Sequence, residues 1–449
     1  MSRLFGTDGV RGIAGTELTC ELAMHIGRAA AVVLTKHTSH KPRLVIGKDT
    51  RLSSDMLEAA MVAGICSVGA DVEILGVIPT PAVAYLVKKY KADAGVMISA
   101  SHNPVEFNGI KLFNADGYKL SDSLEDEIED IVNGDLTQYL KNGVELGRVT
   151  YAKNAAADYV KHLMDSIDDN LEGMTVAVDC ANGSASVTAE ALLKGLGARP
   201  LMLNDAPDGT NINDGCGSTH METLTGFMKK HRCQIGVAFD GDADRCLAVD
   251  EEGNQLDGDR MLAIFSKDMK KSGKLSKDTV VVTVMSNLGF FHFAKKEQVQ
   301  AMATKVGDRY VLEEMIRGGY CLGGEQSGHI IFSDHATTGD GQLSAIKLMS
   351  VMKAEGKKLS ALGAVMERYP QVLVNIKADD AGKRVLDEDN TVKQTIAALS
   401  DELGCDGRIL VRASGTEPLI RVMVEGKNFD AINQCALKIA NVIKERMVG

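Results

Sequence analysis

The sequence lacks several features that mark whole classes of protein. None of its 449 residues is tryptophan, aromatic residues make up only 4% of the chain, and no basic stripe is interleaved with aromatics. Lys and Arg number 50 against 61 Asp and Glu, which gives a formal net charge of −11. This balance argues against a nucleic-acid-binding protein. An anionic ligand would therefore need a local concentration of positive charge in an acidic chain.

The sequence also shows no pattern typical of membrane insertion or export. No apolar run approaches the roughly 20 residues needed to span a bilayer, and the N-terminal residues MSRLFGTDGVRG do not resemble a signal peptide. The nine cysteines are odd in number and scattered, and no Cys-x-x-Cys pair occurs. We therefore expect a cytoplasmic protein without a membrane partner, in which most cysteines serve as small apolar side chains.

Strand and helix patterns alternate along most of the chain. The length alone predicts about three domains, and the alternation predicts α/β units with mixed, mainly parallel sheets. From about residue 371 the pattern changes to three strands and one closing amphipathic helix. We predict three α/β domains, residues 1–155, 156–255 and 256–370, and a smaller C-terminal α+β domain, residues 371–449. No internal sequence repeat shows the first three to be alike.

The segment ISASHNPVEFNGIKLF (98–113) carries a hydroxyl next to an imidazole. A predicted apolar strand ends near Ser101 and His102, and Pro104 favours a turn. A strand-end hydroxyl beside a histidine is typical of a nucleophile or a phosphate carrier; a polar turn that His102 merely fixes is the alternative. Lys111 is either solvated, or partly buried near the loop with a lowered pKa suited to proton transfer.

The loop DGDADR (240–245) follows the apolar strand IGVAF and repeats an aspartate at every second position. On an extended segment or in a tight loop, Asp240, Asp242 and Asp244 can converge. Three converging carboxylates repel one another unless a hard divalent cation lies between them, and oxygen ligands without His or Cys favour Mg²⁺ over Zn²⁺. Arg245 completes the charge balance or holds a phosphate. An acidic surface turn is the alternative.

A glycine-rich loop, GGEQSGH (323–329), lies between two short apolar runs. Its glycines allow close backbone approach. Glu325 and Ser327 alternate along it and could bind the hydroxyls of a sugar. A plain glycine-rich turn explains the pattern equally well.

The segment RASGTEPLIR (412–421) combines two guanidinium groups, two hydroxyls and loop N–H groups. Such a combination forms an anion nest and fits a phosphate that is held rather than transferred. The residues concerned are Arg412, Ser414, Gly415, Thr416 and Arg421. The Gly-Lys-Ser/Thr ending of an ATP-binding P-loop is missing, and a turn with two solvated arginines is the alternative.

Taken together, these loops suit phosphoryl transfer on a small polyhydroxylated phosphate. Over essentially the whole chain the sequence resembles the α-D-phosphohexomutase superfamily, through FGTDGVRG, ISASHNP, DGDADR, GEQSGH and RASGTEPLIRVMVEG in that order. The GEQSGH and FGTDGVRG segments are more similar to the branch that acts on glucosamine phosphates than to the phosphoglucomutase/phosphomannomutase branch. The segment DCANGSAS departs slightly, since Gly or Ala is commoner in the family where Ser184 stands.

The resemblance implies four domains around a central active-site cleft, the first three alike, and a role for each loop. Ser101 would be the phosphoserine, with Lys111 as general acid/base and Arg11 and His102 beside the transferring group. The three aspartates would hold Mg²⁺ together with an oxygen of phosphorylated Ser101. Glu325 and Ser327 would bind the sugar. The phosphate-binding set would be Arg245, Arg412, Ser414, Gly415, Thr416 and Arg421.

The resemblance also implies a reaction and partners. The enzyme would interconvert glucosamine 6-phosphate and glucosamine 1-phosphate on the route to UDP-N-acetylglucosamine. Glucosamine 1,6-bisphosphate would be the intermediate and activator. A homodimer is implied, although no segment marks an interface. The alternatives are a phosphoglucomutase or phosphomannomutase, a metal-dependent sugar phosphatase, and a non-catalytic sugar-phosphate sensor.

Overall fold

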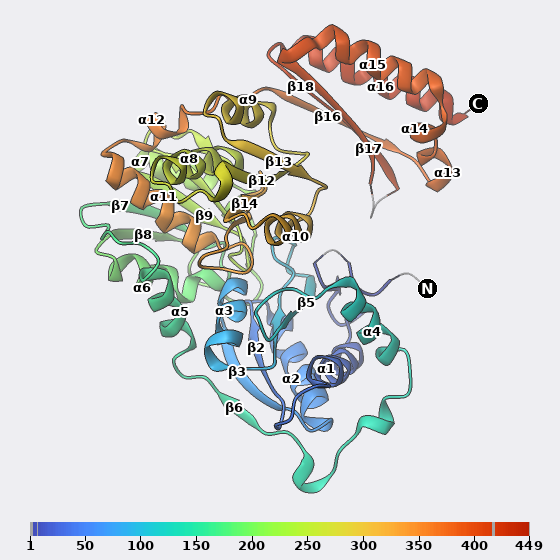
Figure 1. The fold of residues 1–449 in the computed structure, drawn as a ribbon. Coiled ribbons are helices and arrows are strands. Elements are labelled where there is room, and N and C mark those ends of the chain that lie inside the picture. The colour runs from blue at the N-terminus through green and yellow to red at the C-terminus, as the bar shows by residue number, and fades with distance from the viewer. Residues whose placement is uncertain (1–2, 7, 415–417, 449) are drawn as a thin grey trace. The chain divides into compact units, whose positions relative to one another are not determined.

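The computed structural model describes residues 3–6, 8–414 and 418–448 (Figure 1). These residues form two compact units. The first contains the chain up to Met285 together with Gln298–Val365, and the second contains Ser286–Glu297 together with the chain from Met366. The finer divisions after residues 155, 255 and 370 stay predictions.

The first unit contains three sheets, whose strand orders are β1-β5-β4-β2-β3-β6, β11-β10-β9-β7-β8 and β13-β12-β14-β15. The strands of the first sheet are β1 (Val10–Ile13), β2 (Arg43–Lys48), β3 (Asp71–Val77), β4 (Ala94–Ile98), β5 (Phe107–Asn114) and β6 (Val149–Tyr151). Those of the second are β7 (Thr175–Asp179), β8 (Arg199–Leu203), β9 (Ile235–Phe239), β10 (Cys246–Asp250) and β11 (Gln255–Leu256). Those of the third are β12 (Thr279–Thr283), β13 (Gln300–Thr304), β14 (Leu322–Gly324) and β15 (Ile330–Phe332).

Helices connect and cover these sheets. Around the first sheet they are α1 (Cys20–Thr35), α2 (Leu52–Ser67), α3 (Thr80–Tyr90) and α4 (Asp122–Val132). Those that follow are α5 (Ala155–Met164), α6 (Ala189–Gly195), α7 (Glu222–Lys230), α8 (Gly258–Lys271), α10 (Asp308–Gly318), α11 (Gly341–Glu355) and α12 (Leu359–Gly363). Among the described residues, no helix is both long enough and apolar enough to cross a membrane.

The three sheets share one topology, which the sequence alone did not show. Their common orders are β5-β4-β2-β3, β10-β9-β7-β8 and β15-β14-β12-β13. In each, three neighbouring strands are parallel and the first strand of the order is antiparallel. The polar loops singled out in the sequence follow β4, β9 and β14, the same position in each sheet. Ligands of open α/β sheets bind at the carboxyl ends of strands, so this topology favours a shared site.

Two glycines let α3 lie close to the first sheet. A Cβ added at Gly47 of β2 would come within 2.6 Å of a Val83 methyl, and one added at Gly95 of β4 within 2.4 Å of a Val87 methyl. Both valines are buried on α3. Any larger residue at either glycine would push the helix outward, and with it Thr80 at its first position.

The second unit has the α+β character that the sequence predicts for the end of the chain, and it also contains Ser286–Glu297. Its sheet is antiparallel in the order β16-β18-β17, from β16 (Gln371–Lys377), β17 (Gly407–Ala413) and β18 (Leu419–Gly426). Its helices are α9 (Leu288–Lys296), α13 (Asp380–Lys383), α14 (Val385–Glu388), α15 (Asn390–Leu403) and α16 (Phe429–Val448). Helices α15 and α16 lie side by side against the sheet (Figure 1). Helix α15 was not predicted from the sequence.

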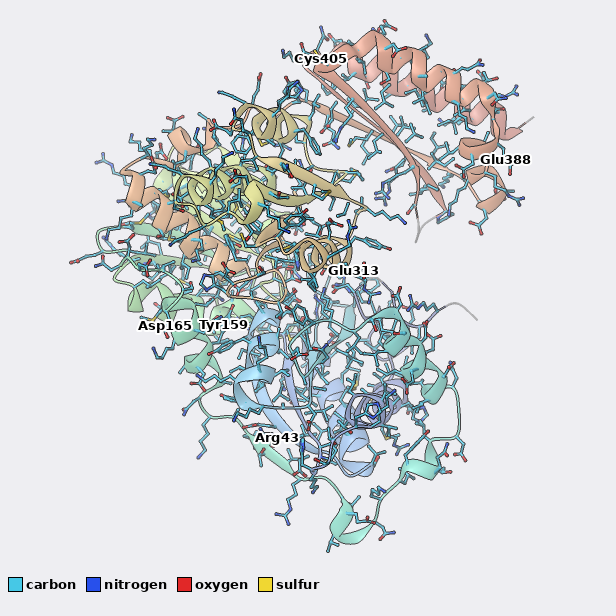
Figure 2. All side chains as sticks on the ribbon, in the orientation of Figure 1. Arg43, Tyr159, Asp165, Glu313, Glu388 and Cys405 are labelled. Atoms are coloured by element: carbon cyan, nitrogen blue, oxygen red, sulfur yellow. The ribbon has the colours of Figure 1, made fainter. Side chains whose placement is uncertain are left out.

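All nine cysteines are free thiols. Six of them are buried, which fits the predicted role as small apolar side chains. Cys405 on the second unit is exposed (Figure 2).

Candidate active site

Ser101 lies just after β4 in a conformation that serine rarely adopts. Its φ is 53°, in the left-handed region, and its side chain is buried. Such a conformation costs of the order of 1–3 kcal/mol and persists only where the surroundings enforce it. The Ser101 hydroxyl donates a hydrogen bond of 2.6 Å to Asp240 Oδ2 and lies 3.4 Å from His102 Nδ1. The serine loop and the aspartate loop therefore meet.

A buried ion pair that the sequence analysis missed holds this serine loop. The Arg51 side chain is fully buried, pairs with Asp49, and donates to the carbonyl oxygens of Ser101, Asn103 and Pro104. Asp49 in turn accepts from the Ser99 hydroxyl, which itself accepts from the Ser101 backbone N–H at 2.9 Å. Together these hydrogen bonds fix the loop and explain how Ser101 keeps its left-handed conformation.

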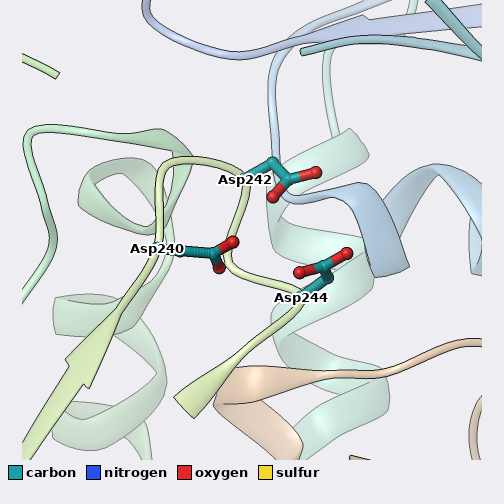
Figure 3. Close-up of side chains that lie close together, drawn as sticks. All are labelled: Asp240, Asp242 and Asp244. Carbon is teal, nitrogen blue, oxygen red and sulfur yellow. The ribbon is translucent and has the colours of Figure 1, made fainter. Parts of the chain in front are cut away.

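The three aspartates of the DGDADR loop converge, as their spacing predicts. Oxygen atoms of Asp240, Asp242 and Asp244 lie within 4.8 Å of one another, and all three residues are buried (Figure 3). The chain turns between them because Ala243 has a φ of 56°. The alternative of an acidic surface turn is therefore wrong.

The electrostatics of this cluster favour a cation. Burial and then the charges of Asp244 and Asp242 raise the pKa of Asp240 well above its usual value. Asp242 Oδ1 and Asp244 Oδ1 are buried and have no hydrogen-bond partner among the described residues. Unsatisfied carboxylate oxygens in a buried cluster are the donor set that Mg²⁺ prefers.

Lys111 on β5 is buried within the same cluster, so a solvated lysine is excluded. Its ammonium lies 2.8 Å from Asp242 Oδ2, 3.0 Å from Asp8 Oδ2 and 3.5 Å from Asp244 Oδ2. Burial alone would lower the pKa of Lys111, but the charges of these carboxylates outweigh it and raise the pKa above its ordinary value. The expectation of a lowered pKa is therefore wrong for this arrangement, in which Lys111 is a charged ammonium.

Cationic groups surround the serine loop. Arg245 Nη1 donates to His102 Nδ1 at 3.1 Å, and its backbone N–H donates to Asp240 Oδ1 at 3.2 Å. Burial, followed by the charges of Arg245 and Arg11, lowers the pKa of His102 to about 4, so this imidazole is neutral at pH 7. Arg11 on β1 pairs with Asp8, and its Nη1 lies 3.4 Å from Asn103 Oδ1. The structure thus gathers positive charge beside Ser101.

A ring of alternating acidic and basic side chains continues from this cluster. In order around the ring its members are Asp244, Lys111, Asp8, Lys119, Asp308 and His329, and His329 returns to Asp244. Four of them were not predicted. Asp8 and His329 lie inside the FGTDGVRG and GEQSGH segments, which could have drawn attention to them, whereas nothing in the sequence marks Lys119 or Asp308 as a pair.

The glycine-rich loop between β14 and β15 also reaches this region. Glu325 is half-buried, accepts from the Gly307 N–H at 3.2 Å and interacts electrostatically with Arg245. Burial raises the pKa of Glu325. Ser327, two residues further along the same loop, is exposed. Of the predicted pair, the structure therefore places Glu325 beside the cluster.

The predicted phosphate-binding segment belongs to the second unit, on β17 and β18. Arg412 and Arg421 are direct partners in the antiparallel register, so both side chains lie on one face. Burial, and then the charge of Arg421, lowers the pKa of Arg412, and Arg412 Nε is buried without a partner among the described residues. Ser414 is buried and its N–H donates to Leu419 O at 2.8 Å. Two facing guanidinium groups favour an anion; Gly415 and Thr416 lie outside the described residues.

Four family models match the chain in succession. They describe phosphoglucomutase/phosphomannomutase alpha/beta/alpha domain I over residues 2–138, domain II over 157–253, domain III over 257–369, and the C-terminal domain over 373–442. Among solved structures, a phosphoglucomutase/phosphomannomutase family protein of Burkholderia thailandensis has a TM-score of 0.81 at 22% identity, covering 98% of both chains. An Aspergillus fumigatus N-acetylphosphoglucosamine mutase, solved with GlcNAc-6P and magnesium, has a TM-score of 0.70 at 19% identity, covering 98% of this chain and 95% of that one.

Curated relatives are far more similar in sequence. A phosphoglucosamine mutase of Clostridium acetobutylicum is 54% identical, and one of Clostridium perfringens is 55% identical, each over 99% of this chain and 100% of the relative. Such identity over full length, together with the four domain models, confirms the resemblance found in the motifs. The chain belongs to the phosphoglucosamine mutase family of the α-D-phosphohexomutase superfamily.

Proposed function

We propose that the chain interconverts glucosamine 6-phosphate and glucosamine 1-phosphate, with Ser101 as the phosphoryl carrier. The observation that carries this proposal is the Ser101 hydroxyl, held in a left-handed conformation 2.6 Å from Asp240 within a buried three-carboxylate cluster. The full-length identity to phosphoglucosamine mutases supports the choice of sugar. An enzyme of this family is an isomerase.

We propose Asp240, Asp242 and Asp244 as the residues that would hold Mg²⁺, together with an oxygen of phosphorylated Ser101. The two buried carboxylate oxygens without partners fit such an ion. When bound, the ion would neutralise charge on the phosphoryl group during transfer. The raised pKa of Asp240 comes from the same crowding, because burial and then the charges of Asp244 and Asp242 disfavour its charged form.

In this scheme the phosphoryl group passes from Ser101 to the free hydroxyl of the sugar, and the intermediate is glucosamine 1,6-bisphosphate. The bond between phosphorus and Ser101 Oγ breaks, a bond to the sugar oxygen forms, and the proton of the sugar hydroxyl ends on Ser101 Oγ. The second transfer reverses these changes at the other position of the sugar. The hydrogen bond from Ser101 to Asp240 is the one expected of the unphosphorylated state.

The remaining predicted residues have roles in orientation and charge. Lys111, with its raised pKa, would enter the reaction as an ammonium that stabilises negative charge and supplies a proton. Arg11 and Arg245 would contribute further positive charge, and neutral His102 would orient Arg245 through Nδ1. Glu325 and Ser327 would bind the sugar. The Arg412–Arg421 strand pair, with Ser414, Gly415 and Thr416, would hold the phosphate that is not being transferred.

A substrate comparison tests the proposed sugar. We expect kcat/KM for glucosamine 6-phosphate to exceed that for glucose 6-phosphate and mannose 6-phosphate by about 10- to 100-fold, the value of one charge-assisted hydrogen bond at the differing carbon. Coupled assays for each 1-phosphate, with inorganic phosphate measured in parallel, give the ratio. Equal or higher rates on glucose or mannose would favour the phosphoglucomutase/phosphomannomutase alternative, and stoichiometric release of phosphate would favour a sugar phosphatase.

The proposal includes a cytoplasmic location, which the nine free thiols support. The homodimer implied by the family stays a prediction.

A further inference from the structure

Three different segments hold the backbone of the aspartate loop. Its successive carbonyl oxygens, those of Gly241, Asp242 and Ala243, each accept one hydrogen bond from outside the loop. The donors are the backbone N–H groups of Ser184 at 2.8 Å, Thr80 at 2.9 Å and Gly341 at 3.0 Å respectively. These donors come from the chain after β7, from the start of α3 and from the start of α11. The aspartate loop is therefore held by three segments, one associated with each of the three sheets of the first unit.

Thr80 differs from the other two donors because it also binds an aspartate side chain. Its hydroxyl donates a hydrogen bond to Asp242 Oδ2, while its N–H donates to the carbonyl of the same residue. Thr80 is completely buried at the first position of α3. Thr80, on a helix that packs against the first sheet, therefore makes two hydrogen bonds to Asp242 in the loop of the second sheet.

The two carboxylate oxygens of Asp242 consequently differ in their hydrogen bonds. Oδ2 accepts from the Thr80 hydroxyl and from the Lys111 ammonium at 2.8 Å. Oδ1 is buried and lacks a partner among the described residues. With Oδ2 engaged from two directions, the carboxylate cannot rotate without losing both bonds. Asp242 is thereby held in a fixed orientation within the three-aspartate cluster (Figure 3).

We propose that Thr80 is a positioning residue for the metal site, whose hydroxyl fixes the orientation of the Asp242 carboxylate through Oδ2 and leaves Oδ1 without a hydrogen bond from the described residues. The inference rests on the proposed metal site. Outer partners that fix the orientation of a metal-binding carboxylate typically change metal affinity by about 10- to 100-fold when removed. Lys111 alone would orient the Asp242 carboxylate less strictly, because its charge is shared among three carboxylates and its ammonium group can donate in several directions.

Thr80→Val tests this directly, because valine keeps the shape, the β-branch and the backbone N–H and removes only the hydroxyl. Thr80→Ser restores a hydroxyl at the same place. Thr50→Val is the matched control: the Thr50 hydroxyl donates to Asn182 O at 2.6 Å, between the same two sheets' segments, and touches no aspartate of the cluster. Each full-length protein is brought to the same Ser101 phosphorylation state, checked by intact mass, and its affinity for Mn²⁺ is measured by electron paramagnetic resonance.

We expect the Mn²⁺ dissociation constant to rise about 10- to 100-fold in Thr80→Val, to stay within about threefold of the parent in Thr80→Ser, and to be unchanged in Thr50→Val. Parental Mn²⁺ affinity in Thr80→Val would overturn the inference, and so would an equal loss in Thr50→Val, which would indicate general loosening between the segments. If the unmodified protein binds no Mn²⁺, the metal proposal itself fails together with this inference. The first two results leave the metal proposal intact, so the two failures are distinguishable.

Discussion

Ser101→Ala is expected to reduce turnover of glucosamine 6-phosphate by at least about 10⁴-fold, because removing a covalent carrier removes the whole two-step route. The protein as purified should carry a mass increment of about 80 Da on part of its population, and the variant should carry none. Intact mass spectrometry and a coupled assay for glucosamine 1-phosphate measure both. The loss should be in kcat, since the sugar-binding and phosphate-binding groups are untouched.

A suitable control is Ser266→Ala. Ser266 is a completely buried serine on α8 whose hydroxyl donates to Ala263 O within the helix. This variant should keep both the mass increment and the turnover. Turnover that survives in Ser101→Ala would show that the carrier lies elsewhere. A mass increment retained in Ser101→Ala would show that another residue is phosphorylated.

Asp240→Asn is expected to lower activity without lowering the stability of the metal-free protein. Burial and two like charges raise the pKa of the Asp240 carboxyl, so folding disfavours its charged form. An amide of the same size removes that charge, and its one oxygen can still accept from the Ser101 hydroxyl at the expense of the longer bond from the Arg245 N–H. We expect the metal-free variant to have an unchanged or higher melting temperature, while kcat in Mg²⁺ falls about 10²- to 10³-fold.

The response to metal separates this account from simple misfolding. A ligand at 100 times its dissociation constant stabilises a protein by about 2.7 kcal/mol, and this Mg²⁺-dependent rise in melting temperature should shrink in Asp240→Asn. The control is Asp165→Asn, an exposed carboxylate (Figure 2), which should behave like the parent. A lower melting temperature without metal in Asp240→Asn would mean that Asp240 stabilises the fold as a charged group, contrary to the electrostatics described here.

Local patterns in the sequence were sufficient to predict the loops that carry chemistry. Each of the serine, aspartate and glycine-rich loops follows a short, fully apolar strand, and that contrast is visible in the sequence. The convergence of Asp240, Asp242 and Asp244 could be predicted because a period of two places alternate side chains on one side of an extended chain.

Contacts between distant segments could not be predicted in this way. Lys111 was recognised as a candidate, but the direction of its pKa shift depends on Asp8, Asp242 and Asp244. Each of these lies more than 100 residues from Lys111 in the sequence and meets it only in the fold. Arg51 looks like an ordinary charged residue at the start of a helix, yet it is fully buried against the serine loop. The pKa of Lys111 and the burial of Arg51 both depend on packing between distant segments, which residue spacing in the sequence does not predict.

The likeness of the three sheets is a second feature beyond the reach of sequence comparison within the chain. Strand order and direction are repeated, while the residues that fill the strands differ. The strands RLVIGK (β2), TVAVD (β7) and TVVVT (β12) each have an apolar, buried centre, but they do not align as a sequence repeat. Topology depends on the pattern of apolar residues and on short connections, and both tolerate wide substitution.

The most direct test of the phosphoryl route is a single-turnover experiment with label on the protein. Enzyme carrying ³²P on Ser101 is mixed in Mg²⁺ with a slight excess of unlabelled glucosamine 6-phosphate, and the label is followed in protein, sugar phosphates and inorganic phosphate. We predict that the label leaves the protein at the rate of turnover and appears in glucosamine 1,6-bisphosphate and then in sugar monophosphate. Product formed while the label stays on the protein, or label released as inorganic phosphate, would contradict the account.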